Sequence, residues 1–489
     1  MDPPAPPLDV DVLVVGAGIS GIDAACRLTL HRPGTTWAVL EARDAVGGTW
    51  DLFRYPGIRS DSDMYTLGFP FRPWRGRESI ATGADIRRYV QDTADEFGVP
   101  ERTHHGQRVE RLDWCSGDQR WSVTARTAAG TVTHTTRFVY LATGYYSYAS
   151  GHVVDLPGRE DFTGEVVHPQ HWPAGMPVEG RRVVVLGSGA TAVTLVPALA
   201  ARGAAQVTML QRSPSYVAAL PSTDVVAAAV RRVLPDAVAH RVVRGKNVVF
   251  STAGYQLMRR RPALGRRMLR RQAARRLPAG YDVDTHFAPR YDPWDQRLCV
   301  APDGDLFDAL SDGRADVVTD TVDRLDAHGI RLASGRHLPA DLVVTATGLR
   351  MQLAGGAQVA VDGEPVDLAR THVYKGLMLS GVPNLALAVG YTNASWTLRA
   401  DLSARWFCSL LRFMDRRGLA VATPRYDEED AGGPGDTPLL GLTSGYVQRA
   451  AGILPRQGRR APWRVVQSYL HDLAVMRLGR IDDGRLELR

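Results

Sequence analysis

VDVLVVGAGISGIDAACRL, residues 10–28, is the stretch of this sequence that decides the fold. Its apolar first half predicts a buried strand, its second half predicts a helix, and Gly16, Gly18 and Gly21 form a GxGxxG turn between them. The first glycine permits the tight turn, the second admits a pyrophosphate close to the backbone, and the third lets helix and strand pack. The helix N-terminus, which includes Ser20, then faces the phosphate charge. The stretch predicts a dinucleotide site in a doubly wound α/β domain.

Glu41 supports this prediction. It ends a second apolar strand twenty residues beyond Gly21, and an acid at this place accepts hydrogen bonds from a ribose diol. The carboxylate would repel a 2′-phosphate, so the first turn predicts an ADP-ribose site without that phosphate. A glycine turn selected for packing alone is the alternative.

A second turn lies in RRVVVLGSGATAVTLVPALA, residues 181–200. The predicted binding residues are Gly187, Ser188, Gly189, Ala190 and Thr191, and an alanine stands in the third glycine position, which is a permitted variant. The next strand ends in Arg212 and Ser213, a cation and a hydroxyl that suit a 2′-phosphate and so predict NADP. A plain surface arginine is the alternative at position 212.

Two nucleotide turns in one chain favour two cofactors, with NADPH passing hydride to a bound flavin. FVYLATGYY (138–146) and DLVVTATGLR (341–350) fit segments that cross between two nucleotide domains. We therefore expect a first FAD-binding part over 1–147 and a second over 340–489. An NADP domain over 148–339 would lie between them, with a helical insertion at about 218–290.

GGTWDLFRYPGIRSD, residues 47–61, predicts the flavin side of the site. Its paired glycines permit backbone close to a ring system, and Pro-Gly predicts a turn. From this loop we assign Gly48, Thr49, Trp50, Arg59 and Asp61 to the cofactor site. Val109, from a later strand, is assigned to the same site.

The sequence resembles the Baeyer–Villiger monooxygenases at two motifs. Residues 47–61 match GGxWxxxx(F/Y)PGxxxD, and DFTGEVVHPQHWP (161–173) matches FxGxxxHxxxWP at Phe162, Gly164, His168, Trp172 and Pro173. The likeness runs nearly end to end and is closest to the ethionamide-activating subgroup. Stretches such as YDPWDQRLCVAPDGDLF and VGYTNASWTLRADL carry it.

The resemblance implies an enzyme with two Rossmann-like domains, FAD and NADPH. It implies conversion of ketones to esters or lactones by way of a peroxide at flavin C4a, and oxidation of thioethers or thioamides. Arg297 matches the arginine that approaches the flavin and stabilises negative charge, and Asp61 matches the carboxylate that orients it. Gln296 departs from the pattern, because many members have lysine there, which contacts the NADP phosphate.

His168 is implied to couple NADP binding to the flavin site from a linker between the domains; a satisfied buried histidine is the alternative. Asn393 and Trp396, in GYTNASWTL, are candidate pocket residues, or they only pack. An N- or S-oxygenating flavin monooxygenase without ketone activity is the alternative enzyme. A membrane-associated or partner-binding protein that uses the flavin as a redox sensor is the alternative of another class.

Composition sets further bounds. Hydrophobic residues make up 44% and charged residues 23% of the 489-residue chain, as in ordinary globular proteins. The four cysteines form no CxxC pair, so no metal site is predicted. Without a long apolar run or a signal-like N-terminus, a cytoplasmic location is expected.

Charge is concentrated in one part of the chain. The net charge is +7, and an arginine cluster spans Arg259–Arg276. This cluster predicts a solvated helix face, with an anionic membrane surface or an acidic partner as alternatives; nucleic-acid binding is not favoured. The acidic, glycine-rich run 427–437 predicts a surface loop.

Overall fold

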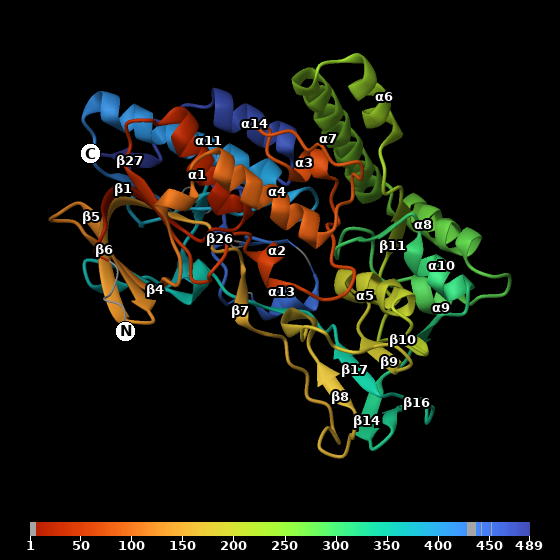
Figure 1. Cartoon of the computed structure of the whole chain (residues 1–489). Helices are drawn as coiled ribbons and strands as arrows, with labels where there is room; N and C mark the ends of the chain where they lie inside the picture. The colour runs from red at the N-terminus through yellow and green to blue at the C-terminus, as the bar shows by residue number, and fades with distance from the viewer. Residues whose placement is uncertain (1–5, 428–436, 442, 451) are drawn as a thin grey trace.

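The computed structural model describes residues 6–427, 437–441, 443–450 and 452–489, and in it two sheets dominate the fold (Figure 1). Most of the acidic run 427–437 lies outside the described residues. The first sheet has the strand order β20-β19-β4-β5-β6-β1-β2-β3, with β23 also paired to β6. Its strands are β1 (Asp9–Val15), β2 (Trp37–Leu40), β3 (Thr103–His104), β4 (Arg108–Cys115), β5 (Arg120–Thr127), β6 (Gly130–Leu141), β19 (Gln358–Val361), β20 (Glu364–Pro365), β21 (Val373–Tyr374), β22 (Met378–Leu379) and β23 (Leu385–Leu387).

Strand β6 serves two parts of this sheet. Its first half alternates buried and open positions and pairs antiparallel with β5. Its last four residues, 138–141, are all buried and lie parallel to both β1 and β23. Alternation suits a sheet with one face open to water, and continuous burial suits a parallel sheet covered on both faces. Helices α1 (Ile19–His31), α4 (Gly83–Glu96), α11 (Trp396–Arg417) and α14 (Tyr469–Leu478) pack with one another above the parallel part (Figure 1).

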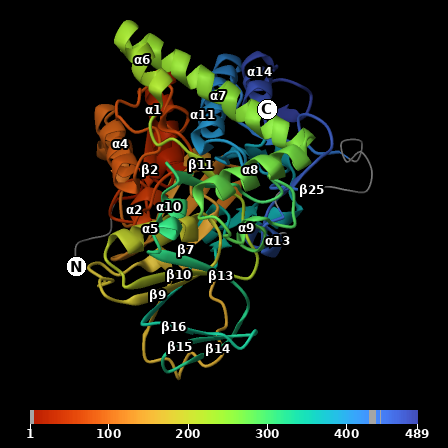
Figure 2. The same cartoon turned by 90° about the vertical axis from the view of Figure 1, so that its right-hand side faces the viewer.

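The second sheet is entirely parallel, with the order β13-β10-β9-β17-β8. Its strands are β8 (Glu165–Val167), β9 (Arg182–Leu186), β10 (Gln206–Gln211), β13 (Ala315–Thr319) and β17 (Leu342–Thr345). In Figure 2 it lies between α5 (Ala190–Ala201) and the meander of β14 (Val322–Asp326), β15 (Gly329–Leu332) and β16 (His337–Pro339). The parallel part of the first sheet and the entirely parallel second sheet, both with helices packed on them, confirm the predicted α/β class.

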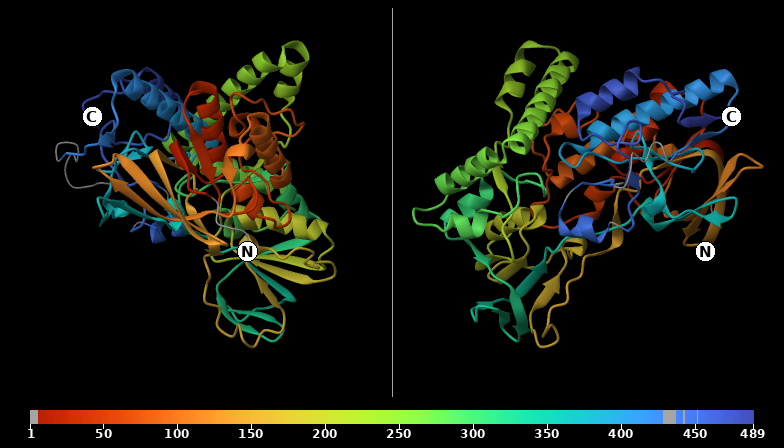
Figure 3. Two further views of the ribbon diagram at one scale, coloured as in Figure 1. Left: turned by 60° about the vertical axis from the view of Figure 1, so that its left-hand side comes forward. Right: turned by 180° about the vertical axis from the view of Figure 1, so that it is seen from behind.

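Two chain segments join the sheets, β7 (Tyr146–Gly151) and β18 (Leu349–Met351), and they pair antiparallel. Within the range 218–290, where the sequence predicts a helical insertion, the structure has α6 (Val225–Val233), α7 (Asp236–Arg260), α8 (Pro262–Arg276) and α9 (Val283–Phe287). Pro262 explains the break between α7 and α8, because proline disfavours a helical residue before it but suits the first helical position. Figure 3 shows α6 and α7 as a hairpin at one end of the molecule.

The smaller elements complete the chain. They are helices α2 (Thr49–Leu52), α3 (Met64–Leu67), α10 (Asp305–Ser311) and α13 (Gly445–Arg449), 3₁₀ turns at Pro100–Arg102, Pro169–His171, Ala354–Gly356 and Leu368–Arg370, and the strand pairs β11 (Val217–Leu220) with β12 (Cys299–Pro302), β24 (Ala422–Pro424) with β27 (Leu486–Leu488), and β25 (Thr437–Pro438) with β26 (Arg456–Gln457). Among the described residues, every helix is too short or too polar to cross a bilayer.

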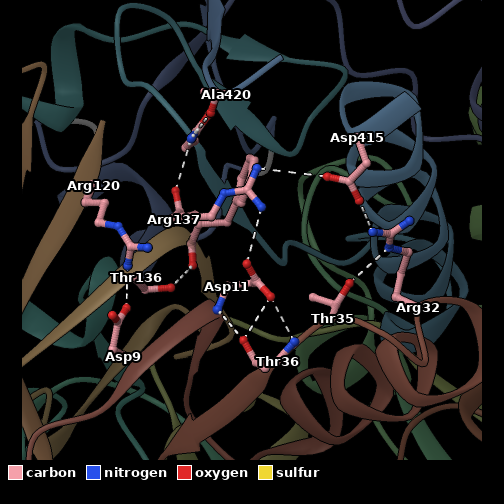
Figure 4. Close-up of polar contacts among 12 residues, drawn as sticks. Asp9, Asp11, Arg32, Thr35, Thr36, Arg120, Thr136, Arg137, Asp415 and Ala420 are labelled. Atoms are coloured by element: carbon pink, nitrogen blue, oxygen red, sulfur yellow. Dashed lines mark hydrogen bonds and ion pairs between the residues drawn. The ribbon is translucent and has the colours of Figure 1, made fainter. Parts of the chain in front are cut away.

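Charged contacts join the first sheet to its covering helices on the side remote from the glycine turn (Figure 4). Arg137 of β6 pairs with Asp11 of β1 at 3.2 Å and lies 3.9 Å from Asp415 of α11. Asp415 also pairs with Arg32, the residue after α1. These partly exposed pairs fix the orientation of the elements that carry the turn, although each contributes little stability.

Candidate active site

The first glycine turn has the geometry that a dinucleotide needs. Gly16 has φ +103°, and a Cβ on it would stand 2.7 Å from the carbonyl oxygen of Ala142. A Cβ on Gly21 would stand 1.8 Å from the Gly16 carbonyl oxygen. Only glycine fits either position, as the tight turn and the close helix–strand contact require.

The second predicted loop lies directly against this turn. Gly48 has φ +56°, and its Cβ would stand 2.8 Å from Cα of Gly18. Side chains are therefore absent where the two backbones meet, and a phosphate can approach both. Glu41 is 5% exposed, and its carboxylate accepts the backbone N–H of Ala17 at 2.7 Å and of Arg43 at 2.9 Å. Burial raises the pKa of this carboxyl, and the two N–H donors oppose that rise.

The second turn repeats the pattern at the end of β9. Gly187 has φ +129°, and its Cβ would stand 2.4 Å from the Ala346 carbonyl oxygen. Ser188 donates to the carbonyl of Ser213 at 2.9 Å, so the turn contacts the end of β10. Arg212 is exposed beside it and forms no ion pair within the described residues. The structure thus brings together the residues predicted to hold a second nucleotide.

The loop 53–61 connects the two turns. A Cβ on Gly57 would stand 2.7 Å from Cβ of Ala198, so the loop packs on α5, the helix of the second turn. Arg59 forms a bidentate ion pair with Asp305 at the start of α10. Burial raises the pKa of Tyr55 to about 12, and a hydrogen bond with Thr191 opposes that rise. The predicted flavin loop therefore touches the second nucleotide fold at three places.

An open cleft of about 940 Å³ begins at the first turn. Seven predicted cofactor or catalytic residues line it, namely Gly18, Ser20, Thr49, Trp50, Arg59, Asp61 and Arg297, and so does Trp396. Trp396 donates to Ser20 Oγ at 2.8 Å and stacks on Tyr145 at 5.0 Å. The glycine cradle, the helix N-terminus and these flat rings fit a flavin dinucleotide.

Arg297 marks the place where this cleft meets a second cavity. That cavity is small and is lined almost entirely by carbon atoms of Tyr145, Leu353, Val389, Tyr391, Trp396, Leu439, Leu440, Tyr446 and Leu454, with Arg297 and Thr392 as the polar members. Tyr145, Trp396 and Arg297 belong to both spaces. An apolar chamber therefore adjoins the cofactor cleft at a cation.

Strained backbone holds the Arg297 loop. Trp294 has φ +73°, which is rare for a bulky residue and marks functional sites when the surroundings impose it. Its ring packs edge-on against Tyr255 of α7, 5.4 Å between centroids, and the carbonyl of Asp295 accepts the backbone N–H of Thr443 at 2.9 Å. The insertion and the C-terminal part thus both position Arg297.

Asp61 and Arg297 face the same cleft, but no ion pair joins them in the described part of the chain. Burial raises the pKa of Asp61, while the nearby charges of Arg297 and Arg59 oppose this. Asp61 thus lies across the cleft from Arg297, with no hydrogen bond between them among the described residues, and its role in orienting Arg297 stays a prediction.

The motif at 161–173 has a packing explanation. A Cβ on Gly164 would stand 2.5 Å from Cζ of Phe162 and 2.6 Å from the carbonyl oxygen of Asp341, so glycine lets the phenyl ring fold back onto the strand. Phe162 and Trp172 belong to the two hydrophobic cores of the second fold, one on each side of its sheet. The motif therefore anchors the segment that leads from β7 into the second sheet.

His168 lies between these anchors and outside the cleft. Its Nδ1 accepts the backbone N–H of Gln170 at 3.1 Å, which caps a 3₁₀ turn. Because Nδ1 accepts, the proton of the neutral ring is on Nε2, which donates to the carbonyl of Gly348 at 3.2 Å. Burial lowers the pKa of this ring, so the neutral form is favoured. His168 contacts backbone of both connections and no reacting group.

Other predicted residues lie apart from the cleft. Val109 is 6% exposed and belongs to the same hydrophobic core as Leu40. Asn393 lines a separate cavity of about 300 Å³ under α7 and donates to the carbonyl of Gln467 at 2.9 Å.

Sequence reasoning missed the tyrosines that line the cleft, Tyr145, Tyr146 and Tyr148. Tyr146 hydrogen-bonds Thr49 at 2.9 Å. The sequence feature that could have identified them is the GYYSY run, which directly follows a strand of the nucleotide fold.

Comparison with known proteins gives consistent matches. Residues 14–75 match the family model of NAD(P)-binding Rossmann-like domains, and residues 84–261 match that of flavin-binding monooxygenase-like proteins. The chain is 50% identical over 480 residues to the FAD-containing monooxygenase EthA of Mycobacterium tuberculosis, covering 98% of this chain and 97% of that protein. It is 44% identical over 478 residues to the probable FAD-binding monooxygenase AlmA of Acinetobacter baylyi, covering 98% and 95%.

Solved structures show the same fold. An oxidized steroid monooxygenase bound to NADP superposes with a TM-score of 0.77 at 22% identity, covering 98% of this chain and 99% of that one. Cyclohexanone monooxygenase in an open crystal structure gives 0.75 at 19% identity, covering 99% and 100%.

Proposed function

Because this chain belongs to the FAD-containing monooxygenases, we propose that it is a Baeyer–Villiger enzyme that converts ketones to esters or lactones. The balanced reaction consumes a ketone, O₂, NADPH and a proton, and releases the ester, NADP⁺ and water. Oxidation of thioethers or thioamides by the same site belongs to the proposal. Membership of this family by itself indicates an oxidoreductase that acts on a small molecule with O₂.

One observation supports the ketone assignment: Arg297 lines both the cofactor cleft and the adjoining apolar cavity. A bound flavin, once reduced, supplies the electrons with which O₂ is split between product and water. A ketone in the cavity presents its carbonyl oxygen toward Arg297. Negative charge grows on that oxygen during nucleophilic attack on the carbonyl carbon. A permanently charged guanidinium stabilises this charge without giving up its proton.

The cavity walls decide which substrates enter. Leucine, valine and tyrosine side chains line the cavity next to Arg297. Such walls bind an apolar body by the hydrophobic effect and exclude water from the charged centre, which strengthens the field of Arg297. Substrates are therefore ketones or sulfides with an apolar group beside the reacting atom.

Arg212 and Ser213 select the nicotinamide cofactor in this proposal. Both are exposed beside the second turn, where a 2′-phosphate on the ribose would lie. Gln296 contributes no positive charge, so selectivity for NADPH depends mainly on Arg212. His168 acts as a positioning residue for the connections between the two folds, and a cytoplasmic location stays a prediction.

The Arg297→Ala variant tests the assignment. Its FAD absorbance should bleach with NADPH in the absence of oxygen as fast as in the parent, while ester formation from a ketone in air falls at least ~100-fold, the range seen when one charge-stabilising donor is removed. Arg290→Ala, an exposed arginine seven residues earlier, is the matched control and keeps full activity.

Ketone and thioether are assayed side by side. Unchanged ester formation in Arg297→Ala contradicts the role of Arg297. Thioether oxidation by the parent with no ester from any ketone tested favours the alternative, an N- or S-oxygenating flavin monooxygenase.

A further inference from the structure

Helices α6, α7 and α8 of the insertion carry a charge opposite in sign to the rest of the chain. Residues 225–281 contain fourteen arginines and lysines and a single acid, Asp236, which gives +13. The whole chain carries +7, so the remainder carries −6 (7 − 13). A strongly cationic surface on an otherwise acidic protein indicates that this surface binds an anionic partner.

Two sets of exposed arginines can be distinguished on α6, α7 and α8. Arg259, Arg266 and Arg270, spaced seven and four residues apart, pair with aspartates between 284 and 295 at 2.5 to 2.9 Å. This set ties the insertion to the body of the protein. A second set is exposed and has no carboxylate partner in the described residues, namely Arg232, Arg241, Arg260, Arg261, Arg267, Arg271 and Arg275. The second set leaves its charge free for a partner.

Apolar side chains share this free surface. Of the sixteen large hydrophobic residues that are exposed in the described chain, ten lie within residues 225–268: Val225, Val226, Val233, Val238, Val242, Val249, Phe250, Leu257, Leu264 and Met268. Each is at least 43% exposed. A concentration of this kind, on a hairpin that stands at one end of the molecule (Figure 3), marks an interaction site.

The spacing gives the surface its shape. On α7, Val238, Val242, Val249 and Leu257 follow at intervals of four, seven and eight residues, which places them on one face. The opposite face buries Val243 and Val248 against the protein. Arg241 and Arg260 lie near the two ends of the exposed stripe. An apolar stripe bordered by arginines is the pattern of a helix that lies in a membrane interface.

We propose that α6, α7 and α8 form a docking surface for an anionic lipid membrane, with the apolar stripe inserted among the acyl chains and the unpaired arginines on the phosphates. Charge complementarity favours an anionic membrane over the other possible partners of this surface. A second copy of the chain would place +13 against +13. Nucleic acid would leave the valines and leucines against phosphates, and within the ten exposed apolar residues Phe250 alone could stack on a base.

Vesicle sedimentation with the FAD-loaded full chain tests the proposal. The protein should sediment with phosphatidylcholine vesicles that contain about a third phosphatidylserine and remain in the supernatant with phosphatidylcholine alone. The triple variant Arg260→Glu, Arg267→Glu and Arg271→Glu should bind the anionic vesicles at least ~100-fold more weakly, since each basic residue near the surface contributes roughly one kcal/mol.

Two further variants make the test specific. Arg108→Glu, Arg202→Glu and Arg370→Glu together change the net charge by the same amount at exposed positions elsewhere, and should bind like the parent. Val242→Ser, Val249→Ser and Leu257→Ser keep the charge and should weaken binding on the order of tenfold or more, because buried apolar area is lost. FAD absorbance and melting temperature verify that each variant is folded.

Three outcomes overturn the proposal. An equal loss of vesicle binding in both arginine variants would mean that net charge alone is responsible for binding. Full binding by the serine variant means attraction to any polyanion, as for an acidic protein surface, without insertion. Absence of binding by the folded parent to anionic vesicles at low salt excludes the membrane altogether.

Discussion

The His168 imidazole lies directly on Gly151, where a Cβ on residue 151 would stand 2.0 Å from its Cε1. Gly151 ends β7, and the carbonyl of Gly348, which accepts the His168 proton, precedes β18. These paired strands are the two connections between the folds. One side chain thus contacts both of them, and it fits only because residue 151 has none.

Gly151→Ala should displace His168. Overpacking of this kind costs about 1–3 kcal/mol, and we expect turnover to fall more than flavin content. The double variant Gly151→Ala, His168→Ala should recover part of the stability that Gly151→Ala loses, because alanine at position 168 makes room for the new Cβ at position 151. Purely additive unfolding free energies would show that the contact has no energetic role.

His168 makes stability depend on pH. Burial lowers its pKa, so as pH falls the unfolded chain takes up the proton first. The stabilisation is complete above the ordinary histidine pKa of about 6.5 and is lost as pH falls through the lowered pKa, because protonated Nδ1 cannot accept from Gln170. Relative to His168→Asn, which caps without titrating, the parent should lose about 1 kcal/mol in acid. Denaturant unfolding at several pH values measures the difference.

Gly48→Ala should weaken flavin binding. The residue would need φ +56°, and its Cβ would meet Cα of Gly18. Strain of about 1–3 kcal/mol corresponds to roughly 5- to 150-fold weaker binding. The ratio of flavin to protein absorbance in the purified variant is the measurement. Gly34→Ala, with open space around its Cβ, is the control and should retain the cofactor.

Arg212→Ala should raise KM for NADPH by about 10- to 100-fold, the value of a charge-assisted contact to phosphate, and leave KM for NADH unchanged. Gln296→Lys should lower KM for NADPH. Arg202→Ala, an exposed arginine just beyond α5, is the comparison variant. Equal effects on both nicotinamides would remove Arg212 from phosphate recognition.

Asp23 is a buried acid outside the site. It is fully buried, and burial, the charge of Asp401 and a hydrogen bond shared with that residue raise its pKa. The folded state therefore keeps the proton longer than the unfolded chain. Stability from this group is greatest below about pH 4 and is lost as pH rises toward the raised pKa.

Asp23→Asn removes that dependence. The variant should be at least as stable as the parent at neutral pH, and the advantage should disappear in acid. Asp118→Asn, on an exposed turn, should change nothing at either pH. Destabilisation by Asp23→Asn at neutral pH would mean that the carboxylate is charged in the folded protein.

The two nucleotide folds were predictable because their signals are local. A GxGxxG turn is a steric requirement within a few residues of its own strand and helix, and the contacts of Gly16, Gly21 and Gly187 meet it. The helical insertion was predictable for a similar reason, since its composition and spacing act within each turn of helix.

Assembly of the site depends on contacts that no local pattern encodes. Arg297, Tyr145 and Trp396 come from three distant segments and meet at the boundary between cleft and cavity. Arg59 pairs with Asp305, and Asp61 faces Arg297 without touching it. The sequence by itself determined which backbone turns could receive two nucleotides, because sterics at glycine act over a few bonds. Only the tertiary structure decided which side chains surround them, because that depends on how buried surfaces from the whole chain pack together.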